Sequence, residues 1–380
     1  MLEKKLVPVL RFAEFDGVWL SKPFKDLTKI NQGLQISISE RFSEKVEDSY
    51  FYITNEFLKK GSKNRYFIKN PSKSVICTED DILMTRTGNT GMVVTNVSGV
   101  FHNNFFKIAY PDYLNKTFLY YFLTLQVTQN YIKRLAGTST IPDLNHSDFY
   151  RIKMNFPQLP EQKKIASFIT EVDTKLSQLT KKKALLENYK KGVMQQIFSQ
   201  ELRFKDGNGN DYGDWEEKKL GEIATITSGS SNRVDSNLTG EYAFFDRSQD
   251  IRTSGIYLFD GEAIIVAGEG QEFIPKYFVG KFDLHQRTYS IMDFNKNNGK
   301  FLYYLIYKNR HYFYIQAVGS TVKSLRLPMF QKMKIKLPNI KEQTKIANFL
   351  SDLDAKIEVL SKSIENTQSF KKGLLQQMFV

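Results

Sequence analysis

A 38-residue segment occurs twice in this chain without a gap, at residues 161–198 and 342–379. Sixteen of its positions are identical, including the first of each copy, Glu161 and Glu342. Such a duplication predicts a tandem of two equivalent units, each a globular half followed by a long helix. We therefore expect the chain to perform the same task twice.

Both copies carry an apolar stripe with the period of a coiled coil. Apolar residues fill eight of ten positions spaced alternately by four and three residues, from Ile165 to Ile197 and again from Ile346 to Met378. A stripe of period 3.5 on a long helix is typical of a coiled-coil seam, and we expect the two helices to form an intramolecular antiparallel pair. At about 1.5 Å per residue each helix would be roughly 57 Å long, a rod between two globular heads.

The composition is that of a folded globular protein, with 41% hydrophobic and 25% charged residues in a chain of 380. No apolar run approaches the ~20 residues needed to cross a bilayer, and the N-terminal segment lacks the pattern of a signal peptide, so we expect a cytoplasmic protein. The single cysteine, Cys77, excludes intramolecular disulfides and a thiolate metal site, and we expect it to be buried on a strand. A formal charge of +13 favours a polyanionic partner.

Each long helix follows a matching approach. A short alternating segment, 151–156 or 332–337, ends at Pro157 or Pro338, and an acidic residue then lies in the first helical turn. Proline ends a strand, and a carboxylate suits the positive end of the helix dipole. After the first helix, the Gly-, Asn- and Asp-rich stretch 202–215 indicates an exposed connector.

The heads mix short β-rich runs with aromatic helical pieces. β-branched residues bounded by glycine predict strands within 74–86, 92–97, 261–268 and 276–282. The matching aromatic segments 118–126 and 301–309 predict one amphipathic helix in each head. Their aromatic side chains are expected to form core rather than a stacking platform for bases.

Polar loops bracketed by glycine are the features that point to a ligand. Arg pairs with guanine and Asn or Gln with adenine, whereas Ser, Thr and Lys suit phosphates. Each loop alone is typical of a solvated turn, but together with the basic charge they favour a DNA reader. The candidate DNA contacts of the first head are Lys63, Asn64, Arg65, Arg86, Thr87, Asn89, Thr90, His102, Asn103, Thr138, Ser139 and Thr140. Those of the second head are Ser231, Asn232, Arg233, Arg247, Gln249, Arg252, Gln271, His285, Gln286, Arg287, Ser320, Thr321, Lys323 and Arg326.

No catalytic or metal-binding pattern stands out. The Asn-Pro pair at 70–71 lacks the rest of a methyltransferase active-site motif, no cofactor fingerprint follows a strand, and the four histidines are scattered singly. One nominal match to metal-dependent nucleases remains, Pro142 and Asp143 followed by 161–163. Its Glu and Lys begin the long helix, and the second copy has Thr344 in place of the Lys. We therefore predict no catalytic residue and no metal site in this chain.

Taken together, these features make the chain resemble the specificity subunit of a type I restriction-modification system. The resemblance lies in the LRF…W…L pattern at each head start (10–27 and 202–220), the polar GTST and GSTV turns, and the P…EQ..IA.F…D.K helix with its KKG…QQ.F end. These motifs cover essentially the whole chain, and their order and duplication make the resemblance specific.

The resemblance implies an α+β fold with a pseudo-twofold tandem repeat. Two mixed α/β target-recognition domains in inverted orientation, 1–156 and 201–337, would be joined by two long spacer helices, 157–200 and 338–380, that form an antiparallel coiled coil. Each domain would read one half of an asymmetric, bipartite site on double-stranded DNA.

The resemblance also implies partners. The spacer helices would dock methyltransferase subunits, two in number, which carry the S-adenosylmethionine chemistry, and a restriction translocase-nuclease subunit would add cleavage. S-adenosylmethionine, ATP and Mg²⁺ are then expected in the partner subunits, with no cofactor in this chain.

The two heads differ at one loop. The first has Arg86 in TRTG, a candidate base or phosphate contact, whereas the second has AGEGQE with Glu269 near that place. Glu269 would accept from the amino group of cytosine or face water, and we favour water.

Two other functions stay open at this point. A non-DNA scaffold would assemble protein partners on the coiled coil, and a self-sufficient metal-dependent nuclease would use the residues around Asp143 and Glu161. Salt-dependent binding to duplex DNA separates the first from a DNA reader, and incubation of the lone chain with Mg²⁺ and plasmid tests the second.

Overall fold

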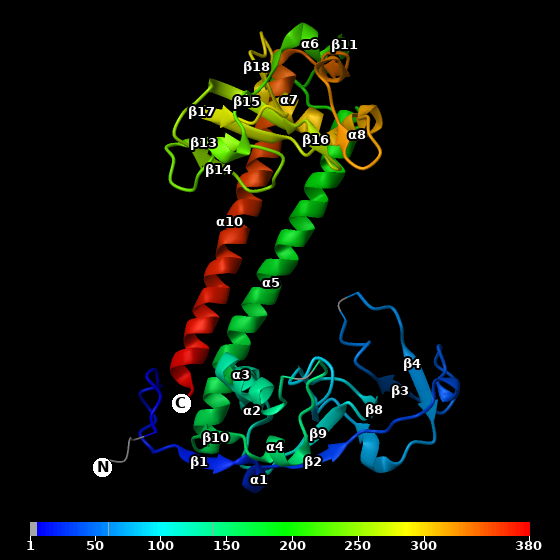
Figure 1. The fold of residues 1–380 in the computed structure, drawn as a ribbon, viewed down its shortest axis with the longest axis vertical. Helices are drawn as coiled ribbons and strands as arrows, with labels where there is room; N and C mark the ends of the chain where they lie inside the picture. The colour runs from blue at the N-terminus through cyan, green and yellow to red at the C-terminus, as the bar shows by residue number, and fades with distance from the viewer. Residues whose placement is uncertain (1–5, 60, 139) are drawn as a thin grey trace. The chain divides into compact units, whose positions relative to one another are not determined.

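The computed structural model describes residues 6–59, 61–138 and 140–380. Two compact units are present, each built from one head and one end of each long helix (Figure 1). The first unit is the chain up to Gln178 with Ser363–Val380, and the second is Leu179–Lys362. The limits of these units differ from the domain limits expected from sequence. Each head folds together with parts of both long helices, whereas the sequence placed the helices in separate domains. No helix in the described ranges is long and apolar enough to cross a membrane.

The first head contains a two-stranded ribbon and two four-stranded sheets, ordered β2-β9-β6-β7 and β4-β3-β8-β5. The ribbon pairs β1 with β10, so the alternating segment before the long helix is a strand, as predicted. Cys77 is buried on β5, also as predicted. The elements are β1 (Leu20–Pro23), α1 (Phe24–Leu27), β2 (Lys29–Gln32), β3 (Ser49–Ile53), β4 (Tyr66–Lys69), β5 (Ile76–Cys77), β6 (Ile82–Thr85), β7 (Val93–Val94), β8 (Gly99–Phe101), β9 (Phe105–Ala109), α2 (Lys116–Thr124), α3 (Gln126–Leu135), α4 (His146–Tyr150) and β10 (Lys153–Phe156).

The second head contains a six-stranded sheet ordered β12-β18-β15-β17-β13-β14, with two short ribbons, β11-β20 and β16-β19. Its elements are β11 (Glu216–Lys219), α6 (Leu220–Ile223), β12 (Thr225–Ser228), β13 (Tyr242–Phe245), β14 (Arg252–Ser254), β15 (Phe259–Ala267), β16 (Glu269–Gly270), β17 (Lys276–Leu284), β18 (Thr288–Met292), α7 (Gly299–Lys308), α8 (His311–Gln316), β19 (Lys323–Ser324), α9 (Leu327–Gln331) and β20 (Lys334–Leu337).

The two heads follow one strand order, but the first head divides it between two sheets. In the second head the long strand β15 pairs with both β17 and β18. In the first head β5 and β6 share that place, pairing with β8 and β9 respectively. The break lies at Thr78–Asp81, where the Asp81 carboxylate accepts from the Thr78 amide at 2.8 Å. The β-rich run expected across 74–86 is therefore interrupted, because this turn withdraws the backbone from the ladder.

The long helices are α5 (Leu159–Phe198) and α10 (Ile340–Met378). All ten predicted seam positions on each helix are buried or half-buried, whereas neighbouring apolar residues such as Leu185 and Val359 are exposed. In the first unit Lys371 Nζ lies 2.6 Å from Asp173 Oδ1, and in the second unit Lys190 pairs with Asp354. In each unit the end of one helix thus lies beside the start of the other, which confirms the antiparallel pair.

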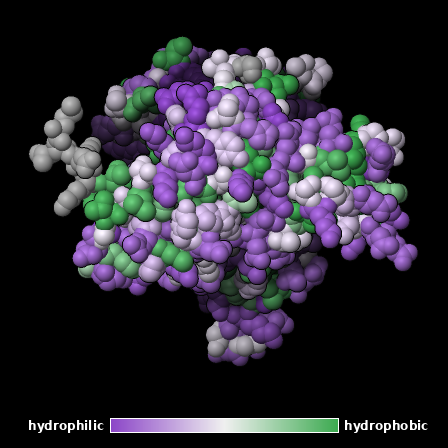
Figure 2. Space-filling model, turned by 90° about the horizontal axis from the view of Figure 1, so that it is seen from below, coloured by the Kyte–Doolittle hydropathy of each residue, from purple (hydrophilic) through white to green (hydrophobic). Residues whose placement is uncertain are grey.

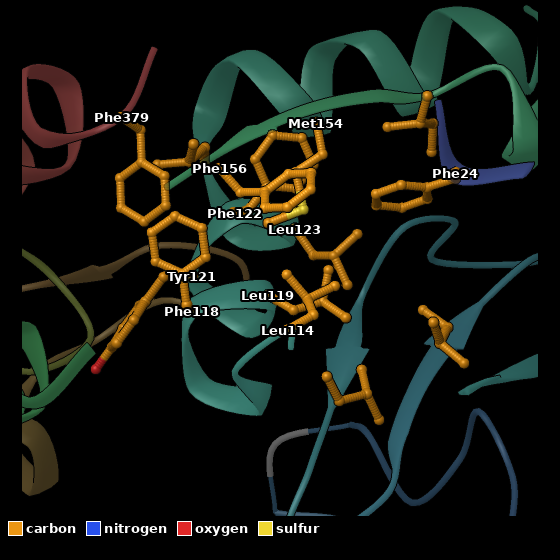
Figure 3. Close-up of a cluster of buried hydrophobic side chains, with 14 of the residues drawn as sticks. Phe24, Leu114, Phe118, Leu119, Tyr121, Phe122, Leu123, Met154, Phe156 and Phe379 are labelled. Atoms are coloured by element: carbon orange, nitrogen blue, oxygen red, sulfur yellow. The ribbon is translucent and has the colours of Figure 1, made fainter. Parts of the chain in front are cut away.

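The aromatic helices α2 and α7 form core, as predicted. Phe118 of α2 is fully buried, and the Phe379 ring stacks on it with centroids 4.9 Å apart (Figure 3). In the second unit Phe198 packs against Phe301 of α7 with centroids 5.7 Å apart. Each head core is therefore completed by the last aromatic residue of the other repeat, and burying such rings is a large share of the stabilisation of a core.

A tyrosine on each of these helices ties the head to both long helices. The Tyr121 hydroxyl donates to Asp173 at 2.9 Å, and the Tyr304 hydroxyl donates to Asp354 at 2.6 Å. These are the same aspartates that pair with the lysines of the opposite helix. Burial and the adjacent carboxylate raise the pKa of Tyr121 and Tyr304, so both remain protonated donors.

Candidate nucleic-acid interface

One tight turn occupies the same place in both heads. It joins β8 to β9 at residues 102–104 and β17 to β18 at residues 285–287. His102 Nδ1 accepts from the Asn104 amide and His285 Nδ1 accepts from the Arg287 amide, each at 3.1 Å. Burial, followed by the nearby Arg41 charge, lowers the pKa of His102, which keeps this ring in the neutral form that can accept.

A glycine lets a second loop approach this turn closely. A Cβ on Gly33 would lie 2.2 Å from the Phe101 carbonyl oxygen, and a Cβ on Gly229 would lie 1.8 Å from the Leu284 carbonyl oxygen. Both distances are far below van der Waals contact, so glycine is required in each head. The approach places the residues that follow Gly33 and Gly229 against the turn.

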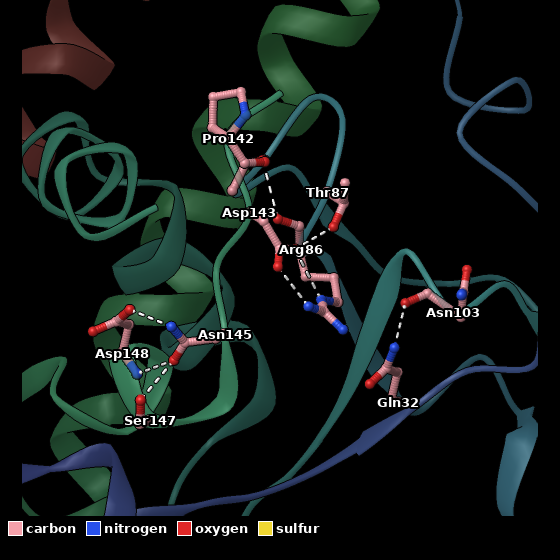
Figure 4. Close-up of polar contacts among 10 residues, drawn as sticks. Gln32, Arg86, Thr87, Asn103, Pro142, Asp143, Asn145, Ser147 and Asp148 are labelled. Atoms are coloured by element: carbon pink, nitrogen blue, oxygen red, sulfur yellow. Dashed lines mark hydrogen bonds and ion pairs between the residues drawn. The ribbon is translucent and has the colours of Figure 1, made fainter. Parts of the chain in front are cut away.

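Three of the predicted loops meet in the first head (Figure 4). The Arg86 amide donates to the Asn104 carbonyl at 2.7 Å, which joins the loop after β6 to the turn. Arg86 Nη2 and Nε lie 2.7 and 3.1 Å from the two oxygens of Asp143, and the Thr87 hydroxyl also donates to Asp143. Partial burial opposes ionisation of Asp143, but the hydrogen bonds from Thr87 and Arg86 outweigh it and lower its pKa.

This geometry revises the expectation for Arg86. Its guanidinium fork is engaged by Asp143 and lies over the Phe106 ring, 5.6 Å from the centroid. The side chain therefore braces two loops together, whereas its place in a loop that contains Gly88 and Gly91 had suggested a fork able to reach a DNA groove. Asp143, which the sequence suggested only as part of a nuclease pattern, is the residue that holds it.

The equivalent loops also meet in the second head. The Gly268 amide donates to the Arg287 carbonyl at 2.7 Å, and the Leu325 amide donates to the Gly268 carbonyl at 2.7 Å. Glu269 lies 2.7 Å from Arg287 Nη1, and its side chain is only 17% exposed. The expectation that Glu269 faces water is corrected by this ion pair, which bridges the loop after β15 to the turn.

A hollow of about 310 Å³ opens beside that ion pair. Four separate segments contribute to its wall, and three arginines stand against two acidic residues. The lining residues are Arg233, Asp246, Arg247, Glu269, His285, Gln286 and Arg287. An adjoining hollow adds Gln249 and Gln271, so the second head gathers candidates from four loops onto one basic, polar surface.

Other predicted residues lie elsewhere or face inward. The Thr90 hydroxyl donates to the Pro142 carbonyl at 2.7 Å, and the buried Ser231 hydroxyl donates to Asp283 at 2.6 Å. Both hydroxyls therefore support loops rather than face solvent. Arg252 lies on β14 and its buried Nε has no hydrogen-bond partner among the described residues. Ser139 lies outside the described residues.

The remaining candidates lie on loops, apart from Lys323, which is half-buried on β19. Arg65 lies over the Phe57 ring, and Lys323 over the Tyr314 ring, with 5.2 and 5.5 Å to the centroids. The Asn64 side chain donates to Glu56 at 2.6 Å. The other candidates are exposed, and among the described residues they have no such side-chain contact: Lys63, Asn89, Thr138, Thr140, Ser320, Thr321 and Arg326. Gln35, which the sequence did not single out, lies on the loop beside the turn and accepts a hydrogen bond from Asn103.

The nominal nuclease residues have structural partners. Arg11 Nε and Nη2 lie 2.8 and 2.7 Å from the Glu161 oxygens, so this carboxylate is held by the N-terminal LRF motif. Arg203 holds Glu342 in the same way, at 3.2 and 2.7 Å. Within the part of the chain that the structure describes, no group of three or more His, Cys, Asp or Glu side chains is placed to hold a metal ion.

Comparisons with known proteins agree with this two-headed arrangement. The family model for the type I restriction modification DNA specificity domain matches residues 18–188 and again 212–367. The type I restriction enzyme MjaVIII specificity subunit of Methanocaldococcus jannaschii is 26% identical over 87% of this chain and 85% of its own length. The EcoDI specificity subunit of Escherichia coli is 31% identical over 43% of this chain and 36% of its own length.

A solved structure shares the fold along the whole chain. The crystal structure of a type I restriction-modification system S subunit from M. genitalium superposes with a TM-score of 0.69 over 99% of both chains, at 17% identity.

Proposed function

Because this chain belongs to the type I restriction-modification DNA specificity family, we propose that each of its heads reads one half of a bipartite, asymmetric DNA site. As a specificity subunit it is a non-catalytic component of a restriction-modification complex. The observation that carries the proposal is that both heads bring equivalent polar loops to one turn while filling those loops with different residues. Two heads with the same loop arrangement but different loop residues are suited to bind two half-sites of different sequence.

The chemistry would then come from partner subunits. We assign the paired helices α5 and α10 as spacer and docking surface for methyltransferase subunits, two in number because the repeat offers equivalent positions twice. S-adenosylmethionine would bind in those partners, and ATP and Mg²⁺ in a restriction translocase-nuclease subunit. Because its proposed substrate is DNA, we infer that the complex acts in the cytoplasm.

The molecular surface seen in Figure 2 is mostly hydrophilic, with hydrophobic residues in small separated groups.

An exchange of heads tests the proposal. Residues 210–336 are replaced by the matching residues of a related subunit, the hybrid is expressed with its methylation partners, and modified bases are mapped by sequencing. One half of the recognised site is expected to change and the other to stay the same, because the contacts that join the second head's loops, such as Gly268 to Arg287 and Leu325 to Gly268, lie within the exchanged segment. A hybrid that changes both halves, or a wild-type complex that modifies DNA without sequence preference, contradicts the proposal.

A further inference from the structure

An amide side chain from the turn bonds to an amide side chain from the neighbouring loop in each head. In the first head Asn103 Nδ2 donates to Gln35 Oε1 at 2.6 Å. In the second head Gln286 Nε2 donates to Asn232 Oδ1 at 2.7 Å. Both pairs are on the surface, and the turn residue is the donor in both. We call these the amide pairs.

The backbone that carries the amide pairs is the same in both heads. Leu34 N donates to the Phe101 carbonyl at 2.9 Å, and Asn103 N donates to the Leu34 carbonyl at 3.2 Å. Gln35 follows Leu34 directly, so it is held beside Asn103.

The second head repeats each of these contacts. Ser231 N donates to the Leu284 carbonyl at 3.3 Å, and Gln286 N donates to the Ser231 carbonyl at 2.9 Å, with Asn232 directly after Ser231. The close approach depends on Gly229 there, as it depends on Gly33 in the first head. An amide pair at this position is thus kept while the surrounding loops differ.

The hydrogen bond inside each pair leaves a defined set of groups free. The turn residue keeps its carbonyl oxygen and the loop residue keeps its amino group. Neither Gln286 Oε1 nor Asn232 Nδ2 takes part in any hydrogen bond within the described residues. In the first head the corresponding Asn103 Oδ1 is shielded from solvent and has no partner among the described residues. The second head therefore presents its free acceptor more openly.

One free acceptor and one free donor together complement a single base edge in the major groove. Adenine offers the N6 amino donor next to the N7 acceptor, whereas guanine offers two acceptors and cytosine one donor. Resting on the proposed function, we propose that the amide pair of the second head, whose acceptor is not shielded, reads a base and selects adenine in its half-site. The turn oxygen accepts from N6 and the loop amino group donates to N7.

The test uses the full chain assembled with its methylation partner, and its site mapped from modified bases. Binding is then measured at fixed salt on duplexes that differ from this site by one base pair. Gln286→Ala and Asn232→Ala are each expected to lower discrimination by roughly 5- to 150-fold at one A·T pair of one half-site, leaving the other half unchanged. Asn130→Ala is the matched control, because Asn130 accepts from Gln126 in an exposed amide pair on α3.

A modified base sharpens the assignment. Replacing the adenine by 7-deazaadenine removes N7, so it should weaken wild-type binding but have no further effect on Asn232→Ala. Uniform loss on all duplexes, relaxation at a G·C pair, or additive effects of the base and the variant each overturn the second head's amide pair as an adenine reader. If the wild-type complex itself shows no site preference, the proposed function fails instead, which distinguishes the two.

Discussion

At the scale of single residues, a buried carboxylate marks the start of each long helix. Glu161 and Glu342 are almost fully buried, and Arg11 and Arg203 each reach both of their oxygens. The hydrogen bond to the glutamate is the main reason that the pKa of each arginine is raised. A buried ion of this kind is tolerated because its partner and its hydrogen bonds replace water.

The two carboxylates differ in one donor. Trp19 Nε1 donates to Glu161 at 3.2 Å, whereas the buried Trp215 Nε1 has no hydrogen-bond partner in the described structure. Trp19→Phe and Trp215→Phe both replace an indole ring by a phenyl ring. Only the first substitution removes a hydrogen bond to a charged group. We expect Trp19→Phe to lower the free energy of unfolding by about 1.5–3 kcal/mol more than Trp215→Phe. Urea unfolding followed by circular dichroism measures both, and equal losses would show that the indole bond contributes nothing.

At the scale of elements, one polar seam position on each long helix, Lys190 or Lys371, is explained by an aspartate on the opposite helix. A polar residue in a coiled-coil seam specifies register at a cost in stability. Here Lys190 and Lys371 each meet an aspartate that also accepts from a head tyrosine. The same three-residue contact therefore sets helix register and head attachment in both units.

Removing one of these aspartates should remove the charged acceptor that a lysine and a tyrosine share. Asp354→Ala is expected to lower the free energy of unfolding by about 1–3 kcal/mol, because Lys190 and the Tyr304 hydroxyl both lose their acceptor. The exposed Asp352 on the same helix is the control, and Asp352→Ala should change stability by less than about 0.5 kcal/mol. Denaturant midpoints provide the comparison. Indistinguishable midpoints for the two variants would rule out a structural role for the contact.

At the scale of the whole molecule, the charge of +13 predicts a salt-dependent affinity for DNA. Each phosphate contact contributes about −0.9 to the slope of log affinity against log salt. Arg247→Ala should reduce the magnitude of that slope by about 1, since this exposed side chain lines the basic hollow. Gln286→Ala should leave the slope unchanged and alter only sequence preference. Titrations of the assembled complex at four salt concentrations measure this, and a slope unaffected by Arg247→Ala would exclude it as a phosphate contact.

Local patterns in the chain were enough to predict the elements that a short sequence window specifies. The seam positions, the aromatic helices and the strand before each long helix follow from periodicity and from single residues such as Pro157 and Pro338. The repeat also made the tandem architecture predictable, because two similar segments fold into two similar elements.

The tertiary structure was needed wherever the partner of a residue is distant along the chain. Arg86 pairs with Asp143, 57 residues away, and Arg11 pairs with Glu161, 150 residues away. No periodicity encodes such pairs, so Arg86 was expected to be free and Gln35 was missed. They depend on which strands become neighbours and on how closely two loops can pack, which at Gly33 leaves no room for a Cβ beside the facing carbonyl. Those distances arise only when the sheets assemble. The sheets assemble because burying their apolar faces is favourable, and the positions of the polar loops follow from that packing.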